Sequence, residues 1–517
     1  MNLTDPGEFE DHESKIEVGA LLTSIFIIAV CGLIYELIIG SLSSYLLGDT
    51  IYQFSLVIGF FLSAMGLGSF LSRVVKRNLL LVFLKIEIAI GIFGGFSAAG
   101  LFAAFSTFQK SYSVIMVATS VILGTLIGLE IPLLTRIAKN YGNLRDTLSN
   151  VLAFDYVGAL IGSLLFPLVL LPYLGLSRTS FLVGAFNLLV VGINLGVFRR
   201  EIHLVRIYSA ATTAALVLIA LGFFMADGIT SLFEKSLYQD EIIYSEQSAY
   251  QRVVVTKYQT DDVRLYLDRE LQFSSRDEYR YHESLIHPAM SLAISHEQVL
   301  IIGGGDGMAA RELLKYSDVK GITLVDIDPA VTHMAQTFGP VVSLNQSSLS
   351  DPRVHILNQD GYKFLSDSPD LYQVIITDLP DPRSETLARL YSRDFYGLIQ
   401  RHLAPGGMFV AQSSSPYFVR SAFWCIAHTM ASTGLYTQAY QTYIPSFGDW
   451  GFVLASNVKI DWSRAHVSVP TRYLTATTLP LMTTFDQDTS EVSTEISTLD
   501  NPAVWRYYLE GWRRWRS

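Results

Sequence analysis

Long apolar runs dominate the first 226 residues of the chain. Seven runs are each long enough to cross a bilayer core, which needs about 20 residues. We predict helices at residues 18–44, 51–72, 79–105, 113–135, 149–173, 177–198 and 204–226. Small residues recur at 64–69 and 158–163 and suit close helix packing in lipid. The pattern predicts a transmembrane helical domain over residues 17–226, after a polar tail over residues 1–16.

Lysine and arginine concentrate in alternate loops of this half. The basic loops contain Arg73, Lys76, Arg77, Arg136, Lys139, Arg145, Arg199 and Arg200. The other loops contain Lys110 and Arg178. The positive-inside rule therefore places the N-terminus and the basic loops in the cytoplasm, in a multi-pass protein of the cell membrane. Seven crossings would put the rest of the chain on the other side, whereas a re-entrant segment would reverse this parity.

The pattern changes after a connector predicted at residues 227–245. Short alternating runs at 252–257 and 263–268 predict a β-hairpin unit over residues 246–275. Strands separated by helical stretches are then predicted at residues 299–302, 322–327, 353–357, 373–378 and 407–412, with a closing strand at 451–455. Such alternation predicts a mostly parallel sheet in a Rossmann-like α/β domain of methyltransferase type, over residues 276–517. Its site should lie at the carboxyl ends of the strands.

Composition narrows the possible partners. The net charge of −10 argues against a nucleic-acid partner and suits cationic substrates. Cys31 and Cys425 are the two cysteines, so neither a disulfide framework nor zinc-site spacing is present, and we expect no metal. The aromatic, basic end at residues 505–515 is predicted to be a packing helix.

A glycine turn, Gly303-Gly304-Gly305-Asp306-Gly307, follows the strand at 299–302 and opens a helix. Glycines allow tight turns and close backbone approach to a ligand, as in nucleotide sites. Asp306 within the turn would repel a pyrophosphate and attract an ammonium group, which disfavours NAD and ATP. Asp326, ending the next strand, is placed to accept hydrogen bonds from ribose hydroxyls. The alternative is a purely architectural turn.

Further acids follow later strands. Asp360-Gly361 comes after the strand at 353–357 and is placed to accept from the exocyclic amine of adenine. Asp378 ends a strand, and Asp381 follows within a stiff proline-flanked loop. Two adjacent carboxylates can bind a cation and hold a base ready. The alternative is a pair of turn aspartates capping a helix.

Together these motifs resemble the spermidine synthase family, the polyamine aminopropyltransferases, across roughly residues 240–460. The matching positions are Tyr250-Gln251, Leu267-Asp268, Gln272, Asp277-Glu278, Tyr281-His282-Glu283, the glycine turn, Asp326-Ile327-Asp328, Asp351-Pro352-Arg353-Val354, Asp360-Gly361, Asp378-Leu379-Pro380-Asp381-Pro382, Phe395-Tyr396 and Gln412-Ser413. The apolar half resembles the membrane domain fused to some bacterial members. The resemblance implies decarboxylated S-adenosylmethionine as donor, a diamine such as putrescine as acceptor, spermidine and methylthioadenosine as products, and a homo-oligomer.

The resemblance also implies roles for the donor-binding residues. The nucleoside would be held by Gln251, Asp326, Asp360 and Gly361, and Asp306 would hold the aminopropyl ammonium.

On the acceptor side, the resemblance makes Asp378 the proton acceptor and Asp381 an anchor for the diamine. His282 would contact the polyamine, and Tyr281 would line the substrate channel. An aliphatic amine arrives protonated, with a pKa of about 10.4, and must lose a proton before it attacks. The donor sulfonium is already an activated leaving group, so we expect no metal and no cofactor beyond the co-substrate.

Three stretches depart from the family pattern. Asp268-Arg269 stands where Asp-Gly is usual, Arg383 begins the segment where Gly-Pro-Ala is usual, and Phe447 replaces a tyrosine. These departures bear on acceptor choice more than on the reaction class. Asp449 or Trp450 is positioned in sequence to supply substitute contacts.

Two rival functions remain open from the sequence. One is an S-adenosylmethionine-dependent methyltransferase, whose donor carries a carboxylate that Asp306 would repel. The other is a polyamine sensor or transporter with a non-catalytic domain, against which the Asp378 and Asp381 pair argues.

Four acids, Glu36, Glu87, Glu130 and Asp155, interrupt the apolar runs, with Lys85 nearby. Ionisable groups in a bilayer are costly and commonly face a partner or a polar cavity. Either they are neutralised or lie near the interfaces, and the helices are an anchor, or Glu36, Glu130 and Asp155 converge on a cavity for a cationic polyamine.

Overall fold

The chain forms two compact units, Met1–Gln239 and Asp240–Ser517, in a computed structural model. The structure describes residues 6–47, 50–139, 144–238, 240–259 and 261–515. Each unit is built around its own buried apolar side chains.

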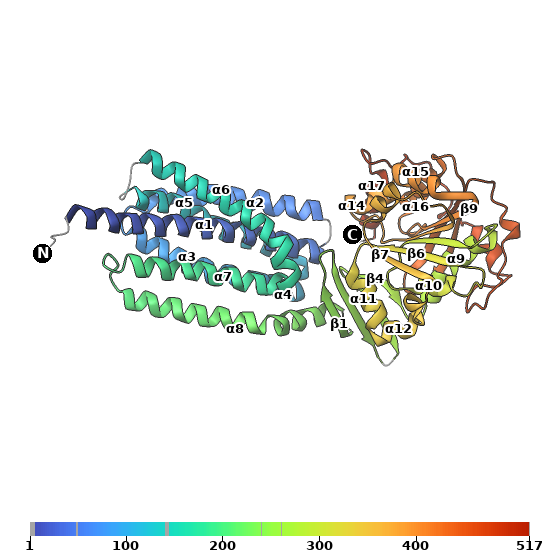
Figure 1. The fold of residues 1–517 in the computed structure, drawn as a ribbon, viewed down its shortest axis with the longest axis horizontal. Coiled ribbons are helices and arrows are strands. Elements are labelled where there is room, and N and C mark those ends of the chain that lie inside the picture. Colours follow the sequence, from blue (N-terminus) through green and yellow to red (C-terminus); the bar gives the residue numbers. More distant parts are fainter. Residues whose placement is uncertain (1–5, 48–49, 140–143, 239, 260, 516–517) are drawn as a thin grey trace. The chain divides into compact units, whose positions relative to one another are not determined.

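All seven apolar runs of the first unit are helical (Figure 1). The helices are α1 (Pro6–Leu47), α2 (Thr50–Leu71), α3 (Leu79–Gly95), α4 (Ser97–Thr107), α5 (Tyr112–Ala138), α6 (Leu144–Leu165), α7 (Leu171–Val197) and α8 (Val205–Tyr238). The predicted polar tail is incorrect for residues 6–16, which belong to α1. Proline suits the first position of a helix, and the polar residues that follow include good helix formers.

Two of these helical regions are broken. Helices α3 and α4 meet at a bend of 46°, so the run predicted at 79–105 is a broken helix. Gly175, within α7, has non-helical angles of φ 68° and ψ −178°, a region that glycine enters without a steric penalty. Figure 1 shows the chain reversing its direction between α6 and α7.

The number of membrane crossings depends on these breaks. By length and composition, five helices among the described residues could cross a membrane, or six if α3 and α4 form one span. That count treats residues 148–197 as one helix of 50 residues. At about 1.5 Å per residue such a helix would be more than twice the bilayer core. Seven crossings, with a division at Gly175, remain a prediction.

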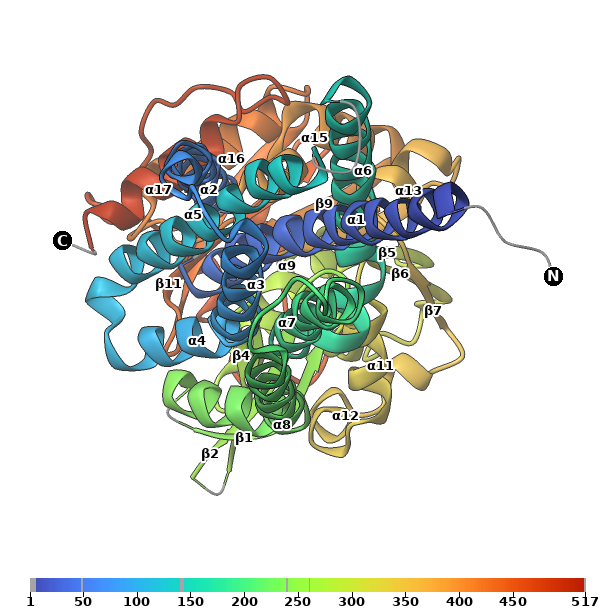
Figure 2. The ribbon, with the colours of Figure 1, turned by 90° about the vertical axis from the view of Figure 1, so that its left-hand side faces the viewer.

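Helix α1 contacts α2, α5, α6 and α7 and lies among them in the view along the bundle (Figure 2). The small residues singled out in the sequence mark close helix contacts. A Cβ at Gly68 would lie 2.1 Å from the Thr125 carbonyl oxygen, and one at Gly158 would lie 2.6 Å from that of Phe26. Large apolar side chains remain exposed on outward faces, including Leu62, Phe70, Leu160, Leu164, Val217 and Phe224. Such a surface suits lipid rather than water.

Of the four acids singled out in the apolar runs, three are shown to lie near one another. Glu87 and Glu130 are fully buried neighbours, and Asp155 is close enough to influence Glu130. Asn187 Nδ2 donates to Glu87 Oε2 at 2.9 Å. Lys85 is exposed. The convergence of Glu36 with Glu130 and Asp155 on one cavity remains a prediction.

The second unit begins with a four-stranded antiparallel sheet in the order β1-β2-β3-β4. Its strands are β1 (Glu241–Gln247), β2 (Arg252–Tyr258), β3 (Asp262–Leu267) and β4 (Glu270–Ser274). The division between the two units falls within the connector predicted at 227–245, but most of this segment is regular structure, since α8 runs to Tyr238 and β1 begins at Glu241. Ile229, Phe233 and Leu237 recur every four residues, so α8 keeps an apolar face that packs in the first unit.

A seven-stranded sheet forms the body of this unit, in the order β10-β11-β9-β8-β5-β6-β7. Its strands are β5 (Gln298–Gly303), β6 (Gly321–Asp326), β7 (Val354–Asn358), β8 (Tyr372–Asp378), β9 (Leu403–Gln412), β10 (Tyr436–Ile444) and β11 (Gly448–Ser456). Strands β5 to β9 are parallel, whereas β10 and β11 are antiparallel. The predicted parallel strands are confirmed, and β10 was not predicted.

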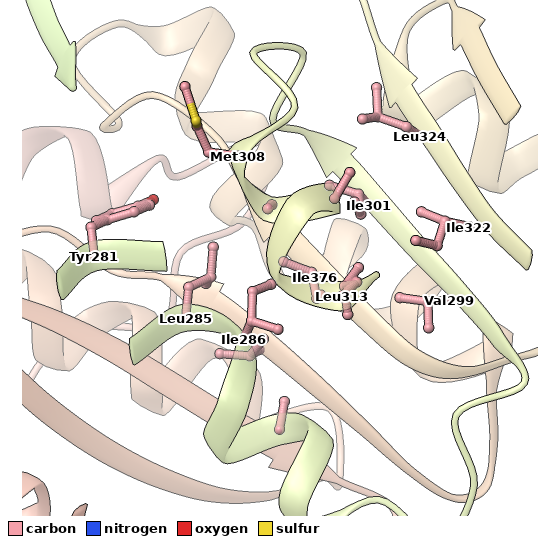
Figure 3. Close-up of a cluster of buried hydrophobic side chains, with 14 of the residues drawn as sticks. Tyr281, Leu285, Ile286, Val299, Ile301, Met308, Leu313, Ile322, Leu324 and Ile376 are labelled. Atoms are coloured by element: carbon pink, nitrogen blue, oxygen red, sulfur yellow. The ribbon is translucent and has the colours of Figure 1, made fainter. Parts of the chain in front are cut away.

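Helices cover both faces of this sheet. They are α9 (Glu278–Leu292), α10 (Met308–Leu313), α11 (Pro329–Thr337), α12 (Gly339–Asn345), α13 (Gly361–Asp367), α14 (Glu385–Ala388), α15 (Arg393–His402), α16 (Arg420–Ala431) and α17 (Ala503–Arg513). On one face, Leu285 and Ile286 of α9 and Leu313 of α10 pack over Val299 and Ile301 of β5 (Figure 3). This packing fixes α9 and the turn after β5, which both carry site residues.

Candidate active site

The parallel strands bring three predicted acids to one edge of the sheet. Strand β5 lies between β6 and β8. The turn with Asp306 therefore lies between Asp326, which ends β6, and Asp378, which ends β8. Gly303 faces Asp378 across the β5–β8 pair, and the Gly304 N–H donates to the Asp378 carbonyl oxygen at 3.1 Å. Acids far apart in the sequence thus share one site.

The turn after β5 requires glycine. Gly303, Gly304 and Gly307 have φ angles of 84°, 65° and 82°. A Cβ at Gly303 would lie 2.0 Å from the Asp378 carbonyl oxygen, and one at Gly305 would lie 2.5 Å from Asp326 Oδ2. The glycines of this turn are therefore required by its backbone geometry. The turn also carries Asp306 into the site, so an architectural role and a ligand-binding role are compatible.

Asp306 and Asp326 are both partly engaged by backbone N–H groups. Asp306 Oδ1 accepts from the Met308 N–H at 2.9 Å, and Asp326 accepts from the N–H groups of Gly305 and Asp328 at 3.0 and 2.9 Å. Burial raises the pKa of both carboxyl groups to about 6. Each carboxylate keeps lone pairs for a ligand, because an ionised carboxylate offers about four acceptor sites.

Asp378 is oriented by a phenol. The Tyr281 hydroxyl donates to Asp378 Oδ1 at 2.6 Å, so α9 fixes the position of this carboxylate. Burial, followed by the nearby Asp378, raises the pKa of Tyr281 well above its usual value. The phenol therefore stays protonated and remains a donor to Asp378.

Asp381 lies on the same loop as Asp378 and is also held by several donors. Ser414 Oγ donates to its Oδ2 at 3.1 Å, and Gln412 Nε2 donates to its Oδ1 at 3.4 Å. Burial raises the pKa of Asp381 to about 6, against hydrogen bonds that lower it. The sequence motif contained Gln412, but its role in holding Asp381 became clear only from the structure.

His282 is the end of a buried network that sequence reasoning missed. Its Nδ1 lies 2.9 Å from Glu278 Oε2, and Glu278 accepts from both terminal nitrogens of Arg311, at 3.0 and 2.9 Å. Burial alone would lower the pKa of His282, but the Glu278 carboxylate raises it to about 9. A cationic His282 offsets part of the charge of Asp306 and Asp378, which both influence it.

The predicted nucleoside-binding residues surround the end of β6. Gln251 Nε2 donates to Asp328 Oδ2 at 3.0 Å, two residues beyond Asp326. The Gln359 N–H donates to the Asp326 carbonyl oxygen at 3.1 Å, which brings Asp360 to the same edge. Asp360 caps α13, because its Oδ1 accepts from the Lys363 N–H at 2.9 Å. It also forms an ion pair with Arg389, which the sequence did not predict.

Gly361 begins α13 at a point of close approach to β5. A Cβ there would lie 2.5 Å from Ile302 Cγ2. Packing alone therefore requires a small residue at this position.

The departures from the family pattern occupy defined positions. Asp268 and Arg269 have φ angles of 47° and 71° in the turn between β3 and β4, a conformation in which glycine is common. Phe447 lies between Tyr281 and Trp450, with ring centroids 6.3 and 5.0 Å apart. Of these three rings, Tyr281 contacts Asp378, and aromatic faces attract ammonium groups.

Comparisons with known proteins agree on one family. Residues 278–463 match the spermine/spermidine synthase domain. The polyamine aminopropyltransferase of Leptospira interrogans is 43% identical over 495 residues, covering 96% of this chain and 99% of the relative. Polyamine aminopropyltransferase 2 of Ralstonia nicotianae is 44% identical over 499 residues, covering 95% of this chain and 98% of the relative. A crystal structure of spermidine synthase from Thermotoga maritima is 25% identical, with a TM-score of 0.44, and covers 48% of this chain and 85% of that one.

Proposed function

Because the chain belongs to the polyamine aminopropyltransferase family, we propose that it transfers the aminopropyl group of decarboxylated S-adenosylmethionine to putrescine. The products would be spermidine and methylthioadenosine. The observation that carries this proposal is the meeting of Asp306, Asp378 and Asp381 with Tyr281 and His282 at one edge of the sheet. Such a site suits two cationic substrates.

The donor would lie across the ends of β5, β6 and β7. Asp326 would accept from the ribose hydroxyls, while Gln251, Asp360 and Gly361 would line the rest of the nucleoside site. Asp306 would pair with the ammonium of the aminopropyl group. The carboxylate of S-adenosylmethionine would meet the same acid, which disfavours methyl transfer.

The acceptor would lie between Asp378 and Asp381. Its reacting amine must lose a proton, and the Asp378 carboxylate, oriented by Tyr281, would take it directly or through one water. The amine nitrogen then forms a bond to the carbon beside the sulfonium. The carbon–sulfur bond breaks, and its electron pair leaves with the neutral thioether. No metal or further cofactor is required by this displacement.

The apolar half would anchor the enzyme as a multi-pass protein in a lipid bilayer. The exposed apolar side chains of α2, α6 and α8 support this proposal, because exposing so large an apolar surface to water is unfavourable. Homo-oligomer formation remains a prediction from the resemblance.

The decisive experiment is mass spectrometry of products formed by the purified full chain. It would be incubated with decarboxylated S-adenosylmethionine and a panel of linear diamines. We expect methylthioadenosine and an aminopropylated diamine, with putrescine used best. Methylated products from S-adenosylmethionine would support the methyltransferase instead, and binding without turnover would support a sensor.

A further inference from the structure

Two acids of the helical unit are buried without a basic partner. Glu87 of α3 and Glu130 of α5 are both 0% exposed. The buried polar side chains described in this unit include no lysine, arginine or histidine. Glu87 Oε1 and both carboxylate oxygens of Glu130 have no hydrogen-bond partner among the described residues. Burying an unpaired carboxylate is costly, so the charge of this pair must be offset by a group from outside the chain.

Helical spacing places both acids at the same depth in the bundle. Each acid is flanked on its own helix, three or four residues away, by one member of each of two separate buried apolar clusters. The flanking residues are Leu84 and Ile90 around Glu87, and Leu134 and Ile127 around Glu130. Residues three or four apart lie on the same side of a helix. Because α3 and α5 pack against each other, the two carboxylates meet between the two clusters.

Two further helices contribute polar side chains at this depth. Asn187 of α7 also lies between members of the same two clusters, Val183 and Val190. Its Nδ2 donates to Glu87 Oε2 at 2.9 Å, and its Oδ1 accepts from the Tyr35 hydroxyl of α1 at 3.3 Å. These bonds fix Glu87 through one oxygen and leave its other oxygen open. The bundle therefore contains a polar layer made of Tyr35, Glu87, Glu130 and Asn187.

We propose that this polar layer binds an ammonium group of an aliphatic polyamine between Glu87 and Glu130. The three open carboxylate oxygens match the three N–H donors of a primary ammonium. The apolar clusters on both sides of the layer suit the methylene chain of such a ligand. The described residues contain no group of three His, Cys, Asp or Glu side chains placed to hold a metal ion. The donor set therefore favours an organic cation.

This inference gives the helical unit a binding role beyond that of an anchor. An ammonium at this depth is costly in a bilayer unless acids face it, and the polar layer supplies two. The α/β domain is proposed to make a molecule of the same class, so the choice of a polyamine as ligand rests on the proposed function. The polar layer itself does not depend on that function, because it contains no residue of the α/β domain.

The test measures equilibrium binding of radiolabelled spermidine to the purified full-length protein. The wild type should bind spermidine at two sites per chain, one in the α/β domain and one in the polar layer. The double variant Glu87→Gln/Glu130→Gln should keep only the first site. Glu130→Gln alone should weaken the second site at least about 10-fold, the lower end for hydrogen bonds to charged groups. Glutamine keeps the size of the side chain, and thermal melting would check that each variant remains folded.

Glu201→Gln is the matched control, because it removes an exposed acid of the same unit. It should keep both sites. Aminopropyl transfer should be unchanged in all these variants, since none of the substituted residues belongs to the α/β site.

Two spermidine sites in the double variant, or a single wild-type site that the variants do not affect, would overturn the inference. Binding of radiolabelled sodium that the double variant loses and spermidine does not displace would assign the layer to a sodium ion instead. An infrared band of a protonated carboxyl group that persists at saturating spermidine, and is absent from the double variant, would assign it to a proton. A wild type that binds spermidine in the layer but forms no aminopropylated product would overturn the proposed function alone.

Discussion

At the scale of single residues, the site separates two kinds of carboxylate by their partners. Asp378 is held by the Tyr281 hydroxyl, whereas Asp306 and Asp326 accept backbone N–H groups. This difference supports a base at Asp378 and fixed counter-ions elsewhere. It also shows why neighbouring acids do not have interchangeable roles.

We predict that Asp378→Asn lowers turnover by at least ~100-fold, the lower range for general-base catalysis. The amide keeps the size of the side chain but cannot take a proton from the amine. Donor affinity should remain nearly intact, because the nucleoside contacts lie at β6 and β7. Single-turnover kinetics and calorimetry with the donor would measure the two effects, and near wild-type turnover would remove Asp378 from this role.

The pH dependence of kcat/KM should report the ionisation of Asp306 and Asp381. Burial raises the pKa values of Asp306 and Asp381 to about 6, so both lose charge as the pH falls through this value. We predict that kcat/KM for the diamine decreases below about pH 6, because a neutral acid no longer attracts an ammonium. Asp381→Asn should lower kcat/KM and make this acid limb shallower. An unchanged limb in that variant would assign it to another group.

At the scale of elements, the junction of β5, its glycine turn and β8 is the most constrained part of the site. The turn needs positive φ angles at Gly303 and Gly304, and Gly303 lies against the Asp378 backbone. The same contact that closes the turn therefore places the base.

We predict that Gly303→Ala destabilises the domain by at least about 1–3 kcal/mol, the cost of a strained backbone conformation. The added Cβ would also lie 2.0 Å from the Asp378 carbonyl oxygen and would displace this residue. Gly339→Ala is a matched control, since no atom lies within 4 Å of its Cβ position. Thermal melting of both variants would measure the difference, and equal melting temperatures would contradict the prediction.

At the scale of the whole molecule, the chain joins an apolar helical unit to an α/β enzyme domain. With α3 and α4 taken as one bent stretch, the helical stretches of the first unit run in alternating directions, so the start of α1 and the end of α8 lie at opposite ends of the bundle (Figure 1). The basic loops after α2, α5 and α7 then belong to the N-terminal end. The topology of this unit and its loop charges thus point to the same orientation.

We predict that the α/β domain lies outside the cytoplasm, as the loop charges indicate. A reporter fused after Ser517 that is active only outside the cytoplasm should therefore be active. A second reporter that functions only in the cytoplasm should be silent at the same position. The opposite result would place the domain beside a cytoplasmic donor and would require either an even number of crossings or an inverted orientation of the whole helical unit.

Local sequence patterns were sufficient to predict much of the fold and the acids of the candidate site. The seven apolar runs, the five parallel strands and the glycine turn follow from periodicity and from glycine's backbone freedom, which are properties of short segments. The family motifs also identified Asp306, Asp378 and Asp381 because these acids end strands or lie in turns. Element ends were less predictable, as in α1 and α8, because a helix continues through polar residues when one face still packs.

Only the tertiary structure determined which distant groups meet. Arg311 pairs with Glu278 beside His282, Arg389 pairs with Asp360, and Gln412 donates to Asp381. None of these contacts has a local signature, since their partners are separated by 29 to 33 positions and are joined only by the tertiary fold. The sequence alone determined the reaction class, whereas the packing of α9 and the order of the strands determined the surroundings of each acid, because electrostatic and hydrogen-bonding effects depend on distance and burial.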